Sequence, residues 1–233
     1  MTGRRVAFFD VDETLLNTKT MLAFWAYWRH HHAAHGPAVT PGGLTPAQLL
    51  TLPREEANRR FWQLFRGVRT EDLMEVGRRW YEEYRRGDGA VIVSALAELR
   101  RHQRRGDMVV LVSGSMRACL EPFAAELGAD LLLCTEQEQS ASGVLTGEVT
   151  QSMIGPAKAR AVRSVMAGLG AQQRDCFAYG DHASDLPMLQ SVGRPVLVGR
   201  DPVLRAAAAR AGQWRVLPSV AGSLEALRED VAA

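Results

Sequence analysis

Short, mostly apolar runs alternate with helical patterns through the C-terminal part of this chain, and this alternation restricts the possible folds most strongly. Predicted strands cover residues 108–112, 130–134, 176–179 and 195–198, and the segments between them have helical spacing. A further apolar run, 5–9, lies near the N-terminus. Apolar runs without polar alternation are typical of strands buried on both faces of a parallel sheet. The sequence therefore predicts an α/β fold in which helices cover both faces of a parallel sheet.

Residues 17–87 interrupt this alternation. The segment is helical in texture, rich in aromatic residues and arginine, and is divided by prolines and glycines. Apolar residues recur at helical spacing between 71 and 86, which predicts an amphipathic helix. The glycines of segment 87–89 then mark a linker. We therefore expect a core formed by residues 1–16 and 88–233, with residues 17–87 inserted as an all-helical domain.

Composition narrows the class of protein. The chain of 233 residues has 28 basic and 26 acidic residues, a net charge of +2, which disfavours a nucleic-acid binder. Its three cysteines form no CxxC pair, which is typical of a protein from a reducing compartment. The longest strongly apolar stretch, residues 21–28, is too short to span a bilayer. We expect a cytoplasmic protein with neither nucleic acid nor membrane as a partner.

Polar side chains follow the predicted strands at the points where the strands end. Two carboxylates come after the first strand, a Ser-Gly-Ser turn after 108–112, and two further carboxylates after 176–179. A lysine lies near the start of the helix predicted over 156–169. The carboxyl ends of parallel strands meet at one edge of the sheet, where such folds bind ligands. The candidate site residues are Asp10, Asp12, Ser113, Gly114, Lys158, Asp181 and Asp185.

These residue types together indicate phosphoryl transfer assisted by a metal. Four carboxylates at one rim repel each other unless a cation neutralises them, and oxygen ligands favour Mg²⁺. The hydroxyl of Ser113 and the ammonium of Lys158 suit a phosphoryl group, and backbone N–H groups of the turn at Gly114 can cradle an anion. Any one of these residues alone is typical of a turn or a helix cap. The combination favours a Mg²⁺-dependent site in which one Asp attacks phosphorus in line.

The order of these motifs resembles that of the haloacid-dehalogenase-like (HAD) phosphatase superfamily. The matching segments are Asp10–Leu15 (Asp-x-Asp-x-Thr-Leu), Val109–Ser113, Lys158 and Gly180–Asp185. Within the superfamily the chain is similar to the branch that includes phosphoserine phosphatase, which carries a helical cap soon after the first motif. The resemblance implies a Rossmann-like core with a helical cap that selects the substrate.

The resemblance also implies a role for each residue. Asp10 would be the nucleophile and form an aspartyl-phosphate, while Asp12 would protonate the leaving alkoxide and then activate water. Ser113 and Lys158 would hold the phosphoryl oxygens. Dehalogenases of the superfamily lack the second Asp of the first motif, so Asp12 favours phosphate chemistry. The implied partners of Mg²⁺ are Asp10, Asp12 through its backbone carbonyl, Asp181 and Asp185, the last directly or through another ligand.

Substrate contacts are expected from the cap and from the turns around the site. Phosphoserine phosphatases hold the substrate ammonium with a Glu nine residues after the nucleophile, and here that position is Lys19. A like charge at close range costs ~1–4 kcal/mol, so Lys19 favours a substrate with an acidic or hydroxyl group near the phosphate. A solvated surface lysine explains the residue equally well. Ser184 is a further implied substrate contact, at a position where relatives often carry Asn.

The sequence thus predicts a Mg²⁺-dependent phosphomonoester hydrolase that acts on a small phosphorylated metabolite through an aspartyl-phosphate. A phosphoserine phosphatase and a phosphotransferase of the same superfamily are the alternatives. A non-catalytic binding protein of the superfamily is disfavoured, because Asp10, Asp12, Ser113, Lys158 and Asp181 are all present.

Overall fold

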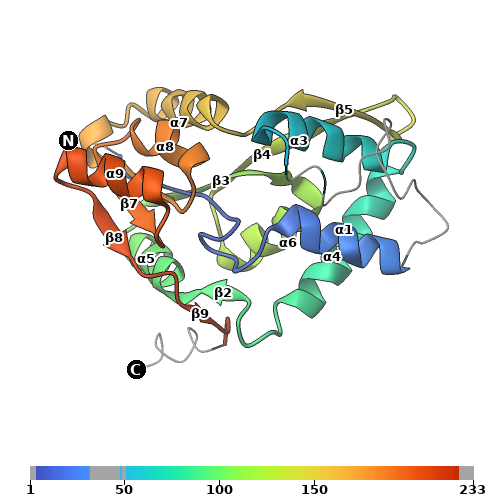
Figure 1. Ribbon diagram of the computed structural model, residues 1–233, viewed down its shortest axis with the longest axis horizontal. Helices are drawn as coiled ribbons and strands as arrows, with labels where there is room; N and C mark the ends of the chain where they lie inside the picture. Colours follow the sequence, from blue (N-terminus) through green and yellow to red (C-terminus); the bar gives the residue numbers. More distant parts are fainter. Residues whose placement is uncertain (1–3, 32–47, 49–50, 226–233) are drawn as a thin grey trace.

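The computed structural model describes residues 4–31, 48 and 51–225. Its described part contains a seven-stranded sheet with the strand order β5-β4-β3-β1-β6-β7-β8 (Figure 1). The strands from β4 to β8 in that order run parallel, and β5 is antiparallel to β4. The predicted α/β fold is confirmed. The strands are β1 (Val6–Phe9), β3 (Met108–Met116), β4 (Leu131–Gln139), β5 (Leu145–Gln151), β6 (Phe177–Gly180), β7 (Arg194–Val198) and β8 (Arg215–Leu217).

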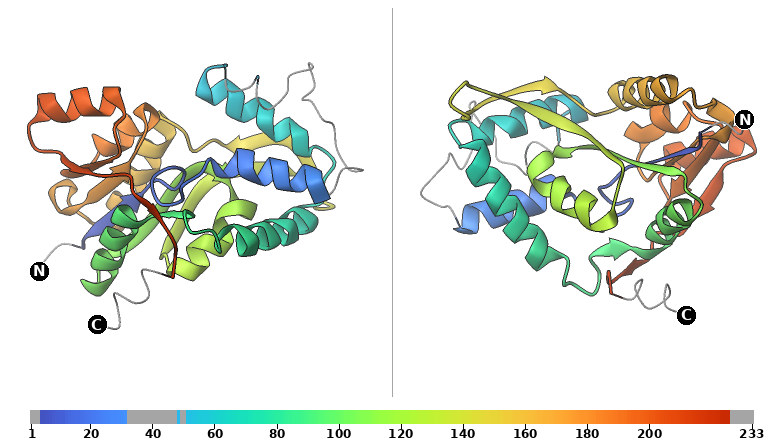
Figure 2. Two further views of the ribbon diagram at one scale, coloured as in Figure 1. Left: turned by 60° about the horizontal axis from the view of Figure 1, so that its bottom comes forward. Right: turned by 180° about the vertical axis from the view of Figure 1, so that it is seen from behind.

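Alternate residues of the central strand β1 point to opposite faces of the sheet, and helices cover each face. Val6 and Phe8 lie in the hydrophobic core beneath one set of helices, Ala7 and Phe9 in the core beneath the other, and all four are fully buried. The two sets lie on opposite sides of the sheet (Figure 2). They are α7 (Pro156–Leu169), α8 (Leu186–Leu189) and α9 (Pro202–Ala211) on the first face, and α5 (Val93–Arg104) and α6 (Arg117–Leu127) on the second.

A helical insertion, the described part of residues 17–87, lies at one end of the molecule (Figure 1). Its aromatic rings pack together: the Phe65 ring lies 6.0 Å from that of Phe24 and 5.3 Å from that of Trp25, centre to centre. The amphipathic helix predicted over 71–86 is present as α4, which runs beside α6 (Figure 2). The division of the chain into core and cap stays a prediction. The elements of the insertion are α1 (Thr20–His31), α3 (Arg54–Trp62), the 3₁₀ turn η1 (Gln63–Phe65) and α4 (Thr70–Tyr84).

The insertion is joined to the edge strand β5 by backbone hydrogen bonds. The N–H of Gly67 donates to the carbonyl of Leu145, and the N–H of Leu145 donates to the carbonyl of Val68, both at 2.9 Å. The N–H of Thr70 donates to the carbonyl of Gly143, also at 2.9 Å. An exposed strand edge offers unpaired backbone groups, and here the segment between η1 and α4 pairs with part of that edge.

Two local predictions from the sequence differ from the structure. From the sequence, residues 144–149 around Gly147 suggest a hairpin, and this prediction is wrong: β5 continues through Gly147, and the turn lies earlier, where the Ser140 N–H donates to the Val144 carbonyl at 2.8 Å. Gly147 has a φ of 84° in a strand whose register with β4 shifts, so the glycine marks an irregularity and not a turn. Residues 91–105 have helical spacing in the sequence, but the helix begins at residue 93, because 91–92 form β2 (Val91–Ile92), which pairs with β9 (Ala221–Gly222).

The sheet order brings three strand ends together. Strand β1 lies between β3 and β6, so the residues that follow or end these strands share one edge of the sheet. The Asp10 N–H extends this arrangement by donating to the Tyr179 carbonyl at 3.0 Å. The edge therefore holds the first, second and fourth motifs side by side, and α7 brings in the lysine of the third.

Candidate active site

A buried ion-pair network forms the centre of this edge. The Lys158 ammonium contacts the Asp10 carboxylate and lies 2.7 Å from Oδ1 of Asp185. All three residues are at most 4% exposed. Lys158 belongs to the first turn of α7, which starts with Pro156 after a Gly155 that has a φ of 53°. The structure thus brings together three residues that lie far apart in the sequence.

Charge pairing keeps the buried lysine ionised. Burial alone lowers the pKa of an ammonium, but the neighbouring carboxylates of Asp10 and Asp185 outweigh that effect and raise the pKa of Lys158 above its ordinary value. For Asp10 the balance is the opposite, because burial and the charge of Asp185 raise its pKa to about 6 while Lys158 lowers it. The site therefore contains more negative charge than one lysine neutralises.

Asp181 completes an acidic cluster. Carboxylate oxygens of Asp10, Asp181 and Asp185 lie within 4.8 Å of one another. Burial, with the charges of Asp10 and Asp185, raises the pKa of Asp181 to about 9. The Thr14 hydroxyl lies 2.9 Å from Asp181 Oδ1 and 3.2 Å from Asp10 Oδ2. Crowded carboxylate oxygens with raised pKa values fit a hard divalent cation, which would stabilise their ionised forms.

The Asp12 carboxylate faces a different set of partners. Its Oδ1 lies 2.7 Å from the Thr20 hydroxyl, and its Oδ2 accepts from the Ser115 hydroxyl at 2.9 Å. The two hydroxyl oxygens are themselves 2.6 Å apart, and both residues are buried. Asp12 is therefore held by one residue of the helical insertion and one of β3, and its carboxylate lies outside the acidic cluster.

The Ser-Gly-Ser segment predicted as a turn is instead an irregular part of β3, whose register with β4 shifts between Ser113 and Met116, and close packing fixes it. A Cβ at Gly114 would lie 2.8 Å from Cγ1 of Ile154, so only glycine fits without movement. The Asn58 amide donates to the Gly114 carbonyl at 3.1 Å, and the Trp62 indole donates back to Asn58 Oδ1 at 3.0 Å. Ser113, which is 1% exposed, accepts a hydrogen bond from the backbone N–H two residues on. This anchoring joins α3 to β3.

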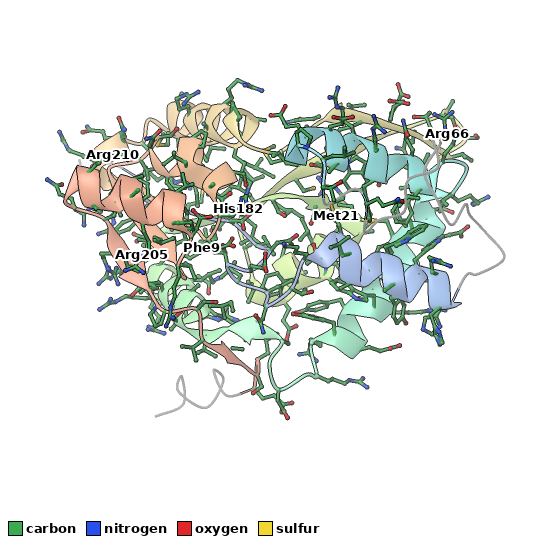
Figure 3. All side chains as sticks on the ribbon, viewed as in Figure 1. Phe9, Met21, Arg66, His182, Arg205 and Arg210 are labelled. Carbon is green, nitrogen blue, oxygen red and sulfur yellow. The ribbon has the colours of Figure 1, made fainter. Side chains whose placement is uncertain are left out.

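A cavity of about 360 Å³ opens over these groups. We define its strand-end wall as Asp10, Asp12, Ser113 and Gly114, and its apolar wall as Met21, Leu22, Leu52, Ala57, Phe61 and Ile154. Lys19, Asn58, Ser115 and His182 also line it. In Figure 3, Met21 lies at the start of α1 on one side of this cavity, and His182 lies on the other side.

Two predicted substrate contacts have local partners. The Lys19 ammonium lies 3.5 Å from the Glu13 carboxylate, with both side chains about half exposed (48% and 46%). The Ser184 hydroxyl lies 3.1 Å from Nδ1 of His182, within the turn that precedes α8, and is not part of the cavity lining. Their roles toward a substrate stay predictions.

Sequence reasoning assigned no role to several residues that the structure places at the site. Thr14 stands within the first motif and Ser115 within the Ser-Gly-Ser segment, so their positions were available as a signal. Thr20 and Asn58 had no such signal, because they belong to the insertion, where no motif was recognised.

The chain matches the family model of haloacid dehalogenase-like hydrolases over residues 7–190, and it belongs to that family. The predicted membership and the prediction of an enzyme are confirmed. Among the described residues, no helix has the length and apolarity needed to cross a membrane.

Two relatives and one solved structure are similar to this chain over most of its length. The chain is 31% identical to an "Inhibition of morphological differentiation protein" of Streptomyces azureus, over 92% of this chain and 78% of that protein. It is 31% identical to a "Probable phosphatase" of Mycobacterium tuberculosis, over 92% of this chain and 75% of that protein. A solved structure described as a phospho-aspartyl intermediate analogue of phosphoserine phosphatase has the same fold, with a TM-score of 0.67, 18% identity and coverage of 99% of both chains.

Proposed function

We propose that this protein is a Mg²⁺-dependent phosphomonoester hydrolase that acts on a small phosphorylated metabolite through an aspartyl-phosphate on Asp10. The observation that carries the proposal is the division of labour between two carboxylates of one cavity. Asp10 lies in the ion-pair network with Lys158, while Asp12 is held apart by hydroxyl groups. The relative named a probable phosphatase supports the same chemistry. In this proposal residues 1–16 and 88–233 form the catalytic core, and residues 17–87 form a cap.

In the first step the Asp10 carboxylate attacks phosphorus, a new P–O bond forms, and the bond from phosphorus to the leaving oxygen breaks. Asp12 gives its proton to that oxygen, so the product leaves as an alcohol. Lys158 and the hydroxyl of Ser113 hold phosphoryl oxygens, and backbone N–H groups at Gly114 add further donors. Attack by Asp10 requires its ionised form, which Lys158 favours.

In the second step water attacks the phosphorus of the aspartyl-phosphate. Asp12, now ionised, takes a proton from this water, and the bond between phosphorus and Asp10 breaks to release phosphate. Both steps use the same position of Asp12, so the hydrogen bonds from Thr20 and Ser115 would serve each of them. If an acceptor alcohol replaced water, the same residues would act as a phosphotransferase.

Asp10, Asp181 and the backbone carbonyl of Asp12 would hold Mg²⁺, with Asp185 as a direct or indirect partner. When bound, the ion neutralises charge and polarises a phosphoryl oxygen. The raised pKa of Asp181, about 9, marks the residue whose ionised form gains most from a nearby cation.

Replacement of Asp10 tests the proposal. Asp10→Asn is expected to abolish Mg²⁺-dependent release of phosphate from p-nitrophenyl phosphate, and a chelator is expected to do the same to the wild type. Wild-type protein that is quenched during turnover of a substrate with a labelled phosphoryl group should carry the label. Hydroxylamine should remove it, as expected for an acyl phosphate.

Asp88→Asn is the matched control, because Asp88 is exposed and far along the chain from every motif. Normal turnover in Asp10→Asn would refute the proposal. Turnover without any hydroxylamine-sensitive label in the quenched protein would refute the covalent route.

A further inference from the structure

One wall of the cavity is apolar. Six side chains form it: two from α1, one from the segment before α3, two from α3 and one from the loop before α7, and they were defined above as the apolar wall. Phe61 and Ile154 are largely buried, and the other four are partly exposed. The phosphoryl group is expected at the opposite, strand-end wall, so the rest of a substrate would lie against these apolar side chains.

Polar groups next to this wall are already paired within the protein. Asn58, 5% exposed, uses its amide on the Gly114 carbonyl and its oxygen on the Trp62 indole. Lys19, the cation at the edge of the cavity, is paired with Glu13. Among the described residues of the lining, the acidic side chains are Asp10 and Asp12, and both belong to the strand-end wall.

A zwitterionic leaving group is a poor match for such a wall. An ammonium or carboxylate packed against these six side chains loses water and meets no opposite charge among them, which is unfavourable. An alkyl or aryl group instead removes apolar surface from water on both sides of the contact. The cavity volume of about 360 Å³ lies near the small end of ligand pockets, about 300–1,000 Å³.

We propose that the preferred substrate is the phosphomonoester of a small apolar alcohol, whose aliphatic or aromatic group packs against the apolar wall. The inference rests on the proposed function and adds the chemical class of the leaving group. It differs from the expectation of an acidic or hydroxyl group near Lys19, because Lys19 already has Glu13 as its partner.

A matched pair of substrates tests the inference. Propyl phosphate and phosphoethanolamine differ only by a methyl group in place of an ammonium. The ammonium makes ethanolamine the better leaving group, so a preference for propyl phosphate cannot come from intrinsic reactivity. We expect kcat/KM with Mg²⁺ to favour propyl phosphate at least tenfold, and to rise roughly two- to fourfold per methylene from ethyl to butyl phosphate. Phosphoserine should be turned over more slowly than propyl phosphate.

A charge placed on the apolar wall should remove the preference for propyl phosphate. Ala57→Glu adds a carboxylate at a partly exposed position of α3, and it is expected to lower the ratio of propyl phosphate to phosphoethanolamine at least tenfold. Arg59→Gln is the control, because it changes the charge of the same helix by the same amount at an exposed position outside this cavity. The ratio should stay at the wild-type value in this variant.

The outcomes separate the inference from the proposed function. A wild-type preference for phosphoethanolamine or phosphoserine, with turnover that Asp10→Asn abolishes, overturns the apolar leaving group and keeps the phosphatase. An equal change of the ratio in Ala57→Glu and Arg59→Gln also overturns it. Failure to hydrolyse any of these esters or p-nitrophenyl phosphate overturns the proposed function, and the inference with it.

Discussion

The strand-end wall and the apolar wall of the cavity differ in charge, in hydrogen bonding and in their place in the sequence. On the strand-end wall, Asp10 is buried in an ion-pair network and Asp12 is bonded through both carboxylate oxygens. Among the described residues that line the cavity, Asn58 is the polar side chain that α3 contributes, and it donates to the Gly114 carbonyl of β3. One wall is thus organised by charge and the other by packing.

This difference separates the chemistry from the choice of substrate. Charged groups buried at the strand ends must be held by opposite charges or hydrogen bonds, so a change there disturbs several partners at once. Side chains of the apolar wall interact mainly through contact area, and such contacts tolerate substitution of one apolar residue by another. We therefore expect the strand-end wall to control kcat and the apolar wall to control the ranking of substrates.

The two lysines of the chain provide the largest expected contrast between the regions. Lys158→Met leaves the carboxylates of Asp10 and Asp185 buried without their cation, which should destabilise the metal-free protein by about 3–5 kcal/mol and abolish turnover. Lys19→Met removes a half-exposed ion pair at 3.5 Å, which should change the free energy of unfolding by less than about 1 kcal/mol. Urea denaturation without Mg²⁺ measures both effects.

The loss of stability in Lys158→Met should depend on pH, and its direction follows from the pKa of Asp10. The pKa of Asp10 is raised from 3.8 to about 6 in the folded protein, so the stability linked to its protonation is present below pH 3.8 and is lost as the pH rises through about 6. Removal of Lys158 takes away an interaction that lowers this pKa. The defect of Lys158→Met should therefore be larger at pH 8 than at pH 5, and a defect equal at both values would contradict the assignment.

The same contrast explains how much of the site the sequence predicts. Each of Asp10, Lys158, Asp181 and Asp185 alone is typical of a turn or a helix cap, but their combination at strand ends and a helix start predicts the site. The parallel order of β3, β1 and β6 then brings them together. Their meeting is a consequence of topology, which the alternation of strands and helices already indicates.

The apolar wall could not be predicted in this way. A helix such as α1 has apolar residues facing the aromatic core and others facing the cavity, and helical spacing alone does not tell these faces apart. Thr20 was missed for a related reason. Its contact with Asp12 depends on how the insertion packs onto β3, and that packing is tertiary information.

The next largest effect is expected at Asp12, whose carboxylate is contacted by Thr20 of the insertion and Ser115 of β3. Thr20→Val and Ser115→Ala each remove a hydroxyl that bonds to the Asp12 carboxylate. Hydrogen bonds to charged groups contribute about 1.5–3 kcal/mol, so each variant should lower kcat/KM for an alkyl phosphate roughly ten- to hundredfold. KM should change little, because neither hydroxyl is expected to bind the substrate.

A comparison of two leaving groups distinguishes a loss of Asp12 positioning from a general structural defect. p-Nitrophenolate leaves without a proton, so kcat/KM for p-nitrophenyl phosphate should fall much less than kcat/KM for an alkyl phosphate. Thr20→Ser keeps the hydroxyl and should restore most of the activity. Equal losses for both substrates, or no rescue by serine, would show that Thr20 does not act through Asp12.

A small effect is expected at Glu13, which follows Asp12 in the chain and pairs with Lys19. Glu13 has a φ of 59°, in the left-handed region that disfavours residues with a Cβ by about 1–2 kcal/mol. Glu13→Gly and Glu13→Ala both remove the ion pair, but only glycine removes the Cβ.

At ordinary positions alanine is the more stable of the two, because glycine loses more backbone entropy on folding, by about 0.5–1 kcal/mol. At Glu13 the order should be reversed, with Glu13→Gly more stable than Glu13→Ala by about 1 kcal/mol in urea denaturation. The reversal would show that the backbone at Glu13 is strained in the folded protein, at the residue whose carboxylate pairs with Lys19. A more stable alanine variant would mean that the loop relaxes freely at this residue and that its backbone is not strained.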